Sequence, residues 1–462
     1  MTIRSQLAIA AGRATQHLTR SLRLGGGTNL PGRIARRIDP QLLSRLTANL
    51  PGGVVLVTGT NGKTTTTRML STILTRAGQQ VLHNRAGANL ITGLTAAALS
   101  QGRGGRSRAD VALFEVDEAH LPAAIVETQP RLVLLHNLFR DQLDRYGEVD
   151  TIAGRWREAL ATLSPEAIVL LNADDPAVAD LGINMRAYVC YYGLEDTSHG
   201  AEAARHTGDS IFCRRCGTSY DYEPLFYGHI GHYRCGSCGH ARPAPHFAIQ
   251  RLLLNGAMGS RIVMRYPDSA LEIELPLPGL YNSINALAAA SAALLLKIRP
   301  AIIRDTLERF SAAFGRIERI KAGQHQLLMA LIKNPVGASE TVRMLVDGAT
   351  GPLYLLIAIN DKTADGTDVS WLWDADFERL HGSIAHAVVT GTRARDMAVR
   401  LKYAGIDEKM IEIHDDLGGA FDVALKTTPD GETMYLLPTY TAMLELREEL
   451  RRRGFVGAFW ED

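Results

Sequence analysis

The chain has 462 residues, a formal net charge of +1 and 46% hydrophobic residues, a size that favours two or three domains over a single core. A net charge so close to zero gives no general reason to expect a nucleic acid or another highly charged partner. No apolar run approaches the roughly 18 residues that a membrane span needs and no signal peptide is evident, so we expect a cytoplasmic protein.

The first fifty residues are basic and form the first expected segment, residues 1–50. They carry eight arginines and one acid, Asp39. Apolar residues recur at helical spacing from Leu7 to Leu22, which predicts a weakly amphipathic helix ended by the glycines at 25–27. Two interpretations stay open, because such a helix can rest on an anionic membrane surface or pack on the main domain with its arginines in solvent.

A glycine-rich turn follows the first strand-like segment of the chain. The β-branched run 54–58 predicts a buried strand, and a helix is expected from the turn to about Ala77, closed by Gly78. In such a turn the backbone N–H groups and the helix N-terminus face an anion, while a lysine adds a mobile charge. We therefore predict a phosphate-binding site, with Mg²⁺ on Thr64, made of Gly59, Thr60, Asn61, Gly62, Lys63, Thr64 and Thr65.

Strands alternate with helices from Pro51 onward, which predicts an α/β domain with a parallel sheet and helices on both faces. Ligands of such sheets lie beyond the carboxyl ends of the strands. A strand over 110–116 delivers Glu115 to that edge, where a carboxylate beside the phosphate loop is suited to hold Mg²⁺. The strands expected in this domain are 54–58, 81–83, 110–116, 131–136 and 167–172.

Four of the five cysteines form two Cys-x-x-Cys pairs, each followed by a glycine: Cys213, Cys216, Cys235 and Cys238. Two such pairs make a closed tetrahedral site for Zn²⁺, and a closed site stabilises rather than catalyses. Two disulfides or a redox pair are the alternatives, both disfavoured in a reducing cytoplasm. We expect a zinc ribbon insert over about 205–245, and we expect Cys190 to lie in the core.

Several motifs resemble the Mur ligases and the folylpolyglutamate synthases. The phosphate loop matches their variant Thr-Gly-Thr-Asn-Gly-Lys-Thr-Thr, residues 279–289 match Gly-x-x-Asn-x-x-Asn, and residues 314–318 resemble their Gly-Arg-x-Glu segment. The resemblance implies that Asn282 and Asn285 touch the nucleotide and that Arg316 meets its terminal phosphate. The strands expected in the last domain, which begins near residue 314, are 327–332, 353–359, 385–390 and 433–437.

Other segments follow the Mur pattern with departures. Residues 136–147 resemble a metal-binding Mur stretch but have Gln142 in place of its histidine, and no lysine lies between Asp141 and Ala173 to serve as the carbamylated lysine of many Mur ligases. Lys333-Asn334-Pro335 lies where these ligases bind the incoming amino acid, but Ala330 replaces the expected acid. These departures predict a nucleophile other than an amino acid.

The combination of motifs resembles the MurT family, the synthetase subunits of lipid II isoglutaminyl synthase, over nearly the whole chain. Besides the Mur-like core and the four cysteines, the segment 360–374 carries the resemblance. It implies ATP-dependent amidation of the D-glutamate α-carboxylate of the lipid II stem peptide through an acyl phosphate, a step of peptidoglycan synthesis. It also implies a separate glutaminase subunit, GatD, that supplies ammonia. Because the substrate is anchored in the membrane, the resemblance further implies that the protein acts at the inner face of the membrane.

The resemblance also assigns roles to residues. Lys63, Arg316 and the Mg²⁺ held by Thr64 and Glu115 would neutralise charge as the γ-phosphoryl group moves. Arg85 and Asn89 would contact the muropeptide or its pyrophosphate. An aspartate of the last domain is expected to complete the glutaminase triad, with Asp368 favoured over Asp361 and Asp365. The alternative is that these three aspartates only shape their loop.

The expected domains are residues 1–50, 51–313 and 314–462. The expected cofactors are ATP, Mg²⁺ and structural Zn²⁺, and no nucleic acid is expected as a partner. Three other functions remain open: a Mur-type or folylpolyglutamate-type amino-acid ligase, a zinc-ribbon ATPase that binds nucleic acid, and a non-catalytic scaffold with an inactive nucleotide site.

Overall fold

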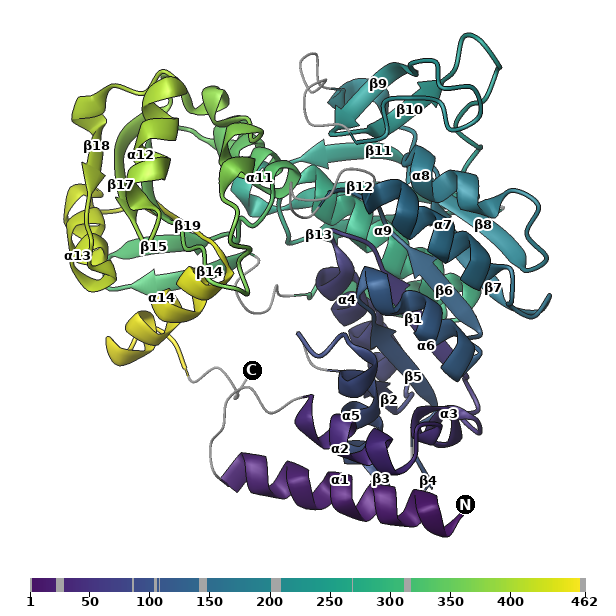
Figure 1. Ribbon diagram of the computed structural model, residues 1–462. Coiled ribbons are helices and arrows are strands. Elements are labelled where there is room, and N and C mark those ends of the chain that lie inside the picture. The colour runs from purple at the N-terminus through teal and green to yellow at the C-terminus, as the bar shows by residue number, and fades with distance from the viewer. Residues whose placement is uncertain are drawn as a thin grey trace.

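The chain folds around two main sheets, which lie side by side in Figure 1. The computed structural model describes residues 2–21, 29–84, 87–103, 106–107, 109–140, 148–200, 209–267, 269–310 and 317–457. We call residues 2–310 the large-sheet body and residues 317–457 the small-sheet body. None of the described helices is both long enough and apolar enough to cross a membrane.

Three helices precede the first sheet: α1 (Ile3–Ser21), α2 (Leu30–Ile38) and α3 (Leu42–Thr47). Small residues let α1 approach α2 closely, since a Cβ on Gly12 would lie 3.1 Å from that of Ala35. Helix α2 approaches α5 (Ile91–Gln101) even more closely, because a Cβ on Gly32 would lie 1.8 Å from the carbonyl oxygen of Thr92. The predicted N-terminal helix is confirmed, and it packs on the large-sheet body.

The large sheet has nine strands in the order β13-β12-β11-β8-β7-β6-β1-β5-β2. Its strands from β2 to β11 pair in parallel, and β12 and β13 add an antiparallel edge. The five strands predicted for this domain are confirmed. The bounds are β1 (Val54–Thr58), β2 (Val81–His83), β5 (Val111–Glu115), β6 (Leu132–Leu135), β7 (Ile168–Asn172), β8 (Tyr188–Leu194), β11 (Phe247–Leu254), β12 (Ser260–Tyr266) and β13 (Ser269–Leu275).

Strand β1 shows why this sheet is apolar throughout. Val55 and Val57 pack into the core that α4 (Lys63–Arg76), α9 (Leu280–Leu295) and α10 (Pro300–Leu307) cover, while Val54 and Leu56 pack into the opposite core. A strand covered on both faces reads as a continuous apolar run. The second core is covered by α1 to α3, α5, α6 (Leu121–Thr128), α7 (Glu148–Leu160) and α8 (Pro176–Ala179).

A small hairpin of β9 (Asp221–Tyr227) and β10 (Ile230–Arg234) lies between β8 and β11 in the sequence and projects above the large sheet in Figure 1. Its own core contains Tyr220, Tyr233 and two of the cysteines. The strands β3 (Gly102–Arg103) and β4 (Arg106–Ser107), each of two residues, form a second two-stranded sheet. The hairpin and its cysteines occupy the predicted insert.

The small sheet has the order β14-β15-β19-β16-β17-β18 and is parallel except for β14. The four strands predicted here are confirmed. The strands are β14 (Glu318–Ala322), β15 (His325–Met329), β16 (Leu353–Ala358), β17 (Ile384–Thr390), β18 (Ile411–Ile413) and β19 (Thr433–Pro438). The helices are α11 (Pro335–Gly348), α12 (Ala394–Tyr403), α13 (Leu417–Thr427) and α14 (Tyr440–Arg452).

Candidate active site

The predicted phosphate loop joins β1 to α4 and depends on two glycines. Gly62 precedes α4 with a φ of +88°, a conformation that glycine adopts far more readily than other residues. A Cβ on Gly62 would lie 2.2 Å from Oδ1 of Asn285, and a Cβ on Gly59 would lie 2.7 Å from Cβ of His136. The loop therefore fits closely between the end of β6 and the start of α9.

Lys63 lies behind this loop and is almost buried, with 8% of its surface exposed. Its Nζ donates hydrogen bonds to the carbonyl oxygens of Gly59, at 2.5 Å, and Thr60, at 3.3 Å. The same nitrogen forms an ion pair of 2.8 Å with Glu118. A cation held in a low-dielectric site interacts strongly with nearby charge, and here that charge is the carboxylate of Glu118.

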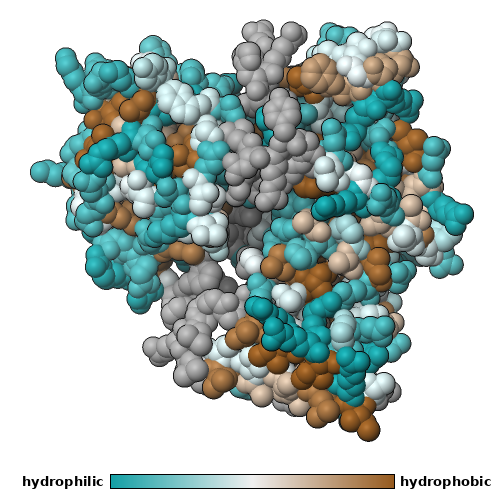
Figure 2. All heavy atoms as spheres, in the orientation of Figure 1, coloured by the Kyte–Doolittle hydropathy of each residue, from teal (hydrophilic) through white to brown (hydrophobic). Residues whose placement is uncertain are grey.

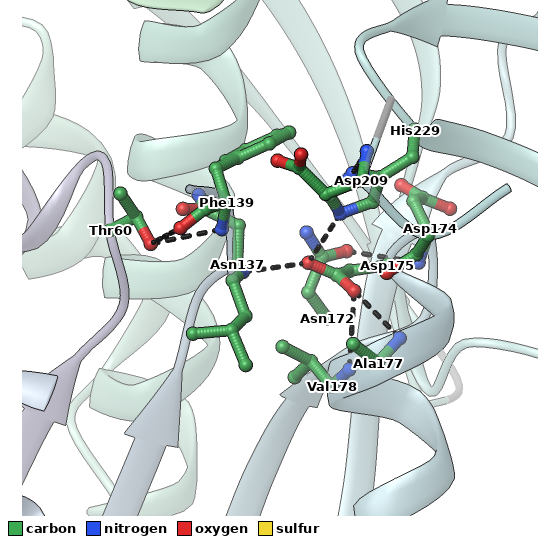
Figure 3. Close-up of polar contacts among 12 residues, drawn as sticks. Thr60, Asn137, Phe139, Asn172, Asp174, Asp175, Ala177, Val178, Asp209 and His229 are labelled. Atoms are coloured by element: carbon green, nitrogen blue, oxygen red, sulfur yellow. Dashed lines mark hydrogen bonds and ion pairs between the residues drawn. The ribbon is translucent and has the colours of Figure 1, made fainter. Parts of the chain in front are cut away.

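Two residues of the loop are tied to the segment after β6. Thr60 Oγ1 donates to the carbonyl oxygen of Phe139 at 3.0 Å and accepts from its N–H at 2.9 Å. Asn61 N–H donates to Oδ1 of Asn137 at 2.8 Å, and Nδ2 of Asn137 donates to the carbonyl oxygen of Asn61 at 3.1 Å. These reciprocal hydrogen bonds fix the loop relative to the end of β6, and Figure 3 shows the pair between Thr60 and Phe139.

Asp175 anchors the same segment from below, as Figure 3 shows. Its carboxylate caps α8 and accepts from the N–H of Leu138 at 2.9 Å and from Nε2 of His229 at 3.2 Å. Nδ1 of His229 accepts from the N–H of Asp209 at 3.2 Å, so this imidazole carries its proton on Nε2. Asp175 thus joins the segment after β6 to His229 at the tip of the hairpin.

His136 at the end of β6 is neutral and serves packing. Burial, with the charge of Lys63 adding to it, lowers the pKa of His136 to about 3. Its Nε2 and the hydroxyl of Thr66 are 2.6 Å apart, and its Nδ1 lies 2.9 Å from the hydroxyl of Tyr192. With both ring nitrogens engaged and a pKa this low, His136 has no role as a base near neutral pH.

A pocket of about 1040 Å³, counting the space at its mouth, opens in front of the loop between the two bodies. The large-sheet body supplies α4 and α9, and the small-sheet body supplies the segment before α11 and α11 itself. The predicted nucleotide residues that line the pocket are Asn61, Gly62, Thr64, Thr65, Asn282 and Asn285. The structure thus brings together residues that lie more than 200 positions apart in the sequence.

The two asparagines of α9 are buried and held by local hydrogen bonds. Nδ2 of Asn282 donates to the carbonyl oxygen of Pro278 at 2.7 Å, and Nδ2 of Asn285 donates to Oδ1 of Asn282 at 3.3 Å. Arg316 and Arg85, predicted to contact phosphate and muropeptide, lie outside the described residues, as do Gln142 and the glycines at 25–27. The carbonyl oxygen of Asn89 accepts from the N–H of Asp117 at 3.1 Å.

Asn334 brings the small-sheet body to the phosphate loop. Its Oδ1 caps α11 by accepting from the N–H of Gly337 at 2.8 Å, while its Nδ2 donates to Oδ1 of Asn61 at 2.9 Å. One buried side chain therefore fixes the start of α11 and touches the loop. The sequence analysis placed Asn334 in an altered amino-acid segment and did not predict this contact.

Glu115 and Thr64 are the predicted Mg²⁺ ligands. Glu115 ends β5 next to Val57 of β1, and Asn84 holds its backbone with two hydrogen bonds of 2.9 Å. Thr64 lies in the first turn of α4 and lines the pocket. A carboxylate and a hydroxyl oxygen are both donors that Mg²⁺ accepts, so each residue has the chemistry of a ligand for this ion, although Glu115 is not among the residues that line the pocket.

Glu340 of α11 is a buried acid in the pocket lining that the sequence analysis missed. Burial raises the pKa of its carboxyl group to about 7, although Arg343 and Arg379 oppose the shift. The nearest ion-pair contact is Nη1 of Arg343 at 3.8 Å. The other charged groups that act on this carboxyl are Asp347 and Asp376.

Replacing Glu340 by glutamine is expected to reduce the decrease in the free energy of unfolding that occurs as the pH rises toward 7. The folded protein keeps the Glu340 proton up to about pH 7, whereas the unfolded chain releases it near 4.5. The contribution of Glu340 to the free energy of folding therefore becomes less favourable as the pH rises from 4.5 to 7, by about 3 kcal/mol. Urea unfolding across this range should show a smaller fall for Glu340→Gln. Parallel curves for the two proteins would contradict the prediction.

The four paired cysteines converge at one end of the hairpin. Their sulfur atoms all lie within 4.8 Å of one another, and the Cys213–Cys238 and Cys216–Cys235 sulfurs are 3.5 Å apart. All are free thiols. A tetrahedral zinc–thiolate centre has bonds of about 2.3 Å and a sulfur spacing near that observed, so the cluster can hold a metal ion.

Backbone geometry supports the two cysteine turns. Gly217 and Gly239, which follow the pairs, have φ values of +77° and +72°, as tight turns of this kind favour. His240 lies beside the cluster, with its Nδ1 2.7 Å from the hydroxyl of Tyr220 and its Nε2 3.7 Å from Asp180. The fifth cysteine, Cys190, is buried in β8 as predicted, and burial raises the pKa of its thiol to about 11.

The three candidate aspartates of the small-sheet body differ in their contacts. Asp361 accepts a hydrogen bond from the hydroxyl of Thr392 at 2.8 Å, and both oxygens of Asp365 accept from Thr441, at 2.6 and 2.5 Å. Asp368 is half-buried and accepts from the N–H of Ser370 at 2.8 Å. Trp373, with 53% of its surface exposed, lies at the end of the same short helix (Ser370–Trp373).

Family models match both bodies of the chain. One described as the Mur ligase middle domain matches residues 57–229, and one described as the MurT ligase C-terminal matches residues 331–443. Two curated relatives cover nearly the whole length. The chain is 36% identical over 99% of both chains to the MurT subunit of the glutamine-hydrolysing lipid II isoglutaminyl synthase of Streptococcus pneumoniae. It is 33% identical to the same subunit of Staphylococcus aureus strain COL, over 92% of this chain and 93% of that one.

Among solved structures, MurF from Acinetobacter baumannii superimposes with a TM-score of 0.66. The superposition covers 92% of this chain and 80% of MurF, at 18% sequence identity. A match at so low a sequence identity shows a similarity of fold alone. The α/β architecture predicted from the sequence is thereby confirmed as that of the Mur ligases.

Proposed function

Since the chain belongs to the MurT family of Mur-type ligases, we propose that it amidates the α-carboxylate of D-glutamate in the lipid II stem peptide at the cost of ATP. The observation that carries the proposal is the pocket between the two bodies, which opens directly onto the phosphate loop. Lys63 is nearly buried and donates to the carbonyl oxygen of Gly59 in that loop. Asn334 of the small-sheet body donates to the side chain of Asn61 in the same loop. The full-length relatives named as subunits of the same synthase support the assignment.

The reaction needs two steps, because a carboxylate has no leaving group that ammonia can displace. In the first step a carboxylate oxygen attacks the γ-phosphorus of ATP, the bond from that phosphorus to the bridging oxygen breaks, and ADP leaves. In the second step ammonia attacks the carbonyl carbon of the acyl phosphate, loses a proton to solvent, and phosphate leaves. The products are the D-isoglutamine amide, ADP and phosphate.

The residues of the pocket have separate tasks in this proposal. The N–H groups from Gly62 to Thr65, at the start of α4, would hold the phosphates, since those of Thr60 and Asn61 donate to Asn137. Lys63 would stabilise the charge on the moving phosphoryl group. Asn282 and Asn285 would position the nucleotide. Arg316 would meet the terminal phosphate. Thr64 and Glu115 would hold Mg²⁺, which when bound neutralises phosphate charge.

One position in the small-sheet body favours a small nucleophile. The position that carries an acid in amino-acid-adding Mur ligases is Ala330 here, and its side chain is buried. Ammonia needs no charged anchor, whereas an amino acid does. The proposed nucleophile is therefore ammonia rather than a free amino acid.

The ammonia is proposed to come from a glutaminase partner of the GatD type. Such enzymes need a reactive cysteine, and a reactive thiol has a lowered pKa and solvent access. Four of the five cysteines of this chain form the proposed zinc cluster, and Cys190 is buried with a raised pKa. The partner would dock near Asp368, beside the exposed ring of Trp373.

Replacing Asp368 by asparagine is expected to lower amidation with glutamine but not amidation with ammonium. If Asp368 completes the partner's triad, glutamine-dependent amidation should fall about a hundredfold, while ammonium-dependent amidation should keep the parent rate. Asp374→Asn serves as the matched control, because Asp374 is an exposed acid of the same segment. Equal losses with both nitrogen sources, or none with glutamine, would contradict the assignment.

The proposed function is tested with the chain purified alone and with its glutaminase partner. Each sample receives lipid II, ATP and either glutamine or ammonium, and mass spectrometry follows the exchange of a hydroxyl for an amino group. The proposal expects amide with glutamine only when the partner is present, and with ammonium in both samples. Addition of a whole amino acid would instead identify a Mur-type or folylpolyglutamate-type ligase.

A further inference from the structure

Helix α1 exposes a continuous apolar stripe on the surface of the large-sheet body. Ile3, Leu7 and Leu18 are 79%, 59% and 59% exposed, and Ala10 and Ala14 between them are also exposed. The spacing of these five residues places them on one face of a helix. Figure 1 shows α1 along the lower edge of the molecule, and Figure 2 shows hydrophobic residues gathered there.

The opposite face of α1 is fixed to the protein. Ala8, Ile9 and Gly12 are buried against the body, and Ser5 Oγ donates to the buried carboxylate of Asp39 at 2.7 Å. A Cβ on Gly12 would lie 2.6 Å from Cδ1 of Leu99. The helix is therefore anchored through one face while the apolar stripe points away from the core.

The surroundings of the stripe are basic. Helix α1 contains no acidic residue, and Arg4 and Arg13 lie at positions that flank the stripe on opposite sides. Arg33 and Arg37 of the neighbouring α2 are exposed. The nearest acid in the sequence, Asp39, is 2% exposed and already pairs with Arg45 at 2.8 Å.

We propose that α1 is an interfacial helix that docks the protein on an anionic lipid bilayer, with the stripe among the acyl chains and the arginines at the headgroups. An apolar helix face bordered by basic residues has the chemistry of such helices. A second copy of the chain fits less well, because two stripes face to face would bring like-charged arginines together.

This inference goes beyond the proposed amidation and does not depend on it. Surface docking would hold the protein where lipid-anchored molecules are concentrated. The reaction itself can be assayed on a water-soluble substrate. Failure of membrane binding and failure of the reaction are therefore separate results.

The test is co-sedimentation of the full chain with vesicles of phosphatidylcholine and with vesicles that also contain phosphatidylglycerol. We expect binding to the anionic vesicles that weakens with salt. Leu7→Gln/Leu18→Gln should reduce it about tenfold or more, and Arg33→Gln/Arg37→Gln, at two exposed positions of α2, should reduce it mainly at low salt. Leu253→Gln/Val126→Gln is the matched control, since Leu253 and Val126 are 55% and 60% exposed elsewhere.

Thermal unfolding of each variant checks that the fold is intact, which exposed positions should allow. Binding that is absent, or that is unchanged in Leu7→Gln/Leu18→Gln, would overturn the proposal. So would sedimentation equilibrium that shows a dimer in the parent and a monomer in that variant, because a second copy would then cover the stripe.

Discussion

Replacing Lys63 by alanine is expected to lower amidation and the associated ATP hydrolysis by about a thousandfold. The ammonium group is nearly buried behind the loop and interacts with two carbonyl oxygens and Glu118. Its removal takes away the cation that would stabilise the moving phosphoryl group. It also leaves the carboxylate of Glu118 unpaired near the phosphates, which adds repulsion.

The measurement is the initial rate of amide formation with ammonium as the nitrogen source, so that the glutaminase plays no part. Lys426→Ala, which removes a lysine from the last turn of α13, is the matched control and should keep the parent rate. Melting temperatures of both variants separate a catalytic loss from unfolding. A Lys63→Ala protein that is folded and as active as Lys426→Ala would exclude the phosphate loop as the site of the reaction.

Replacing Cys235 by serine is expected to abolish metal binding and to damage the active site at a distance. Loss of a structural metal costs on the order of several kcal/mol, so we expect the melting temperature to fall by about 10 °C. Activity should fall as well, because the tip of the hairpin lines the pocket with Tyr227. Arg343 of α11 donates to the carbonyl oxygens of Phe226 and His199, both at 2.9 Å.

Metal analysis of the purified proteins checks this prediction. The parent chain should carry one zinc ion and Cys235→Ser none, while Cys190→Ser should keep the ion because Cys190 lies outside the cluster. Chelation of the parent protein should reproduce the loss of melting temperature. Zinc content that is equal in the parent and in Cys235→Ser would contradict the proposed centre.

The strands of both sheets were predictable where burial gives a simple pattern. Strand β1 is apolar at Val54, Val55, Leu56 and Val57 because each face of the sheet is covered. The antiparallel edge was missed, although β13 alternates buried Leu271, Ile273 and Leu275 with exposed Glu272 and Glu274. That alternation is the usual signal of a strand with one wet face, and it could have been found.

The parts of the site that lie within sequence motifs were predictable. Glycine conformation and helix position follow from local sequence, so the loop and the first turn of α9 were placed correctly. The contacts that complete the site join Lys63 to Glu118, Thr60 to Phe139 and Asn61 to Asn334, across 55, 79 and 273 positions. Nothing local specifies such pairs. The raised pKa of Glu340 likewise depends on burial by other elements.

The central claim is that the γ-phosphoryl group of ATP passes to a carboxyl oxygen before ammonia displaces it. The direct measurement uses lipid II with ¹⁸O at both oxygens of the α-carboxylate of D-glutamate and follows the label by mass spectrometry of the phosphate released. The account predicts that each amide formed leaves one ¹⁸O atom in phosphate. Phosphate without the label, at the same yield of amide, would contradict it.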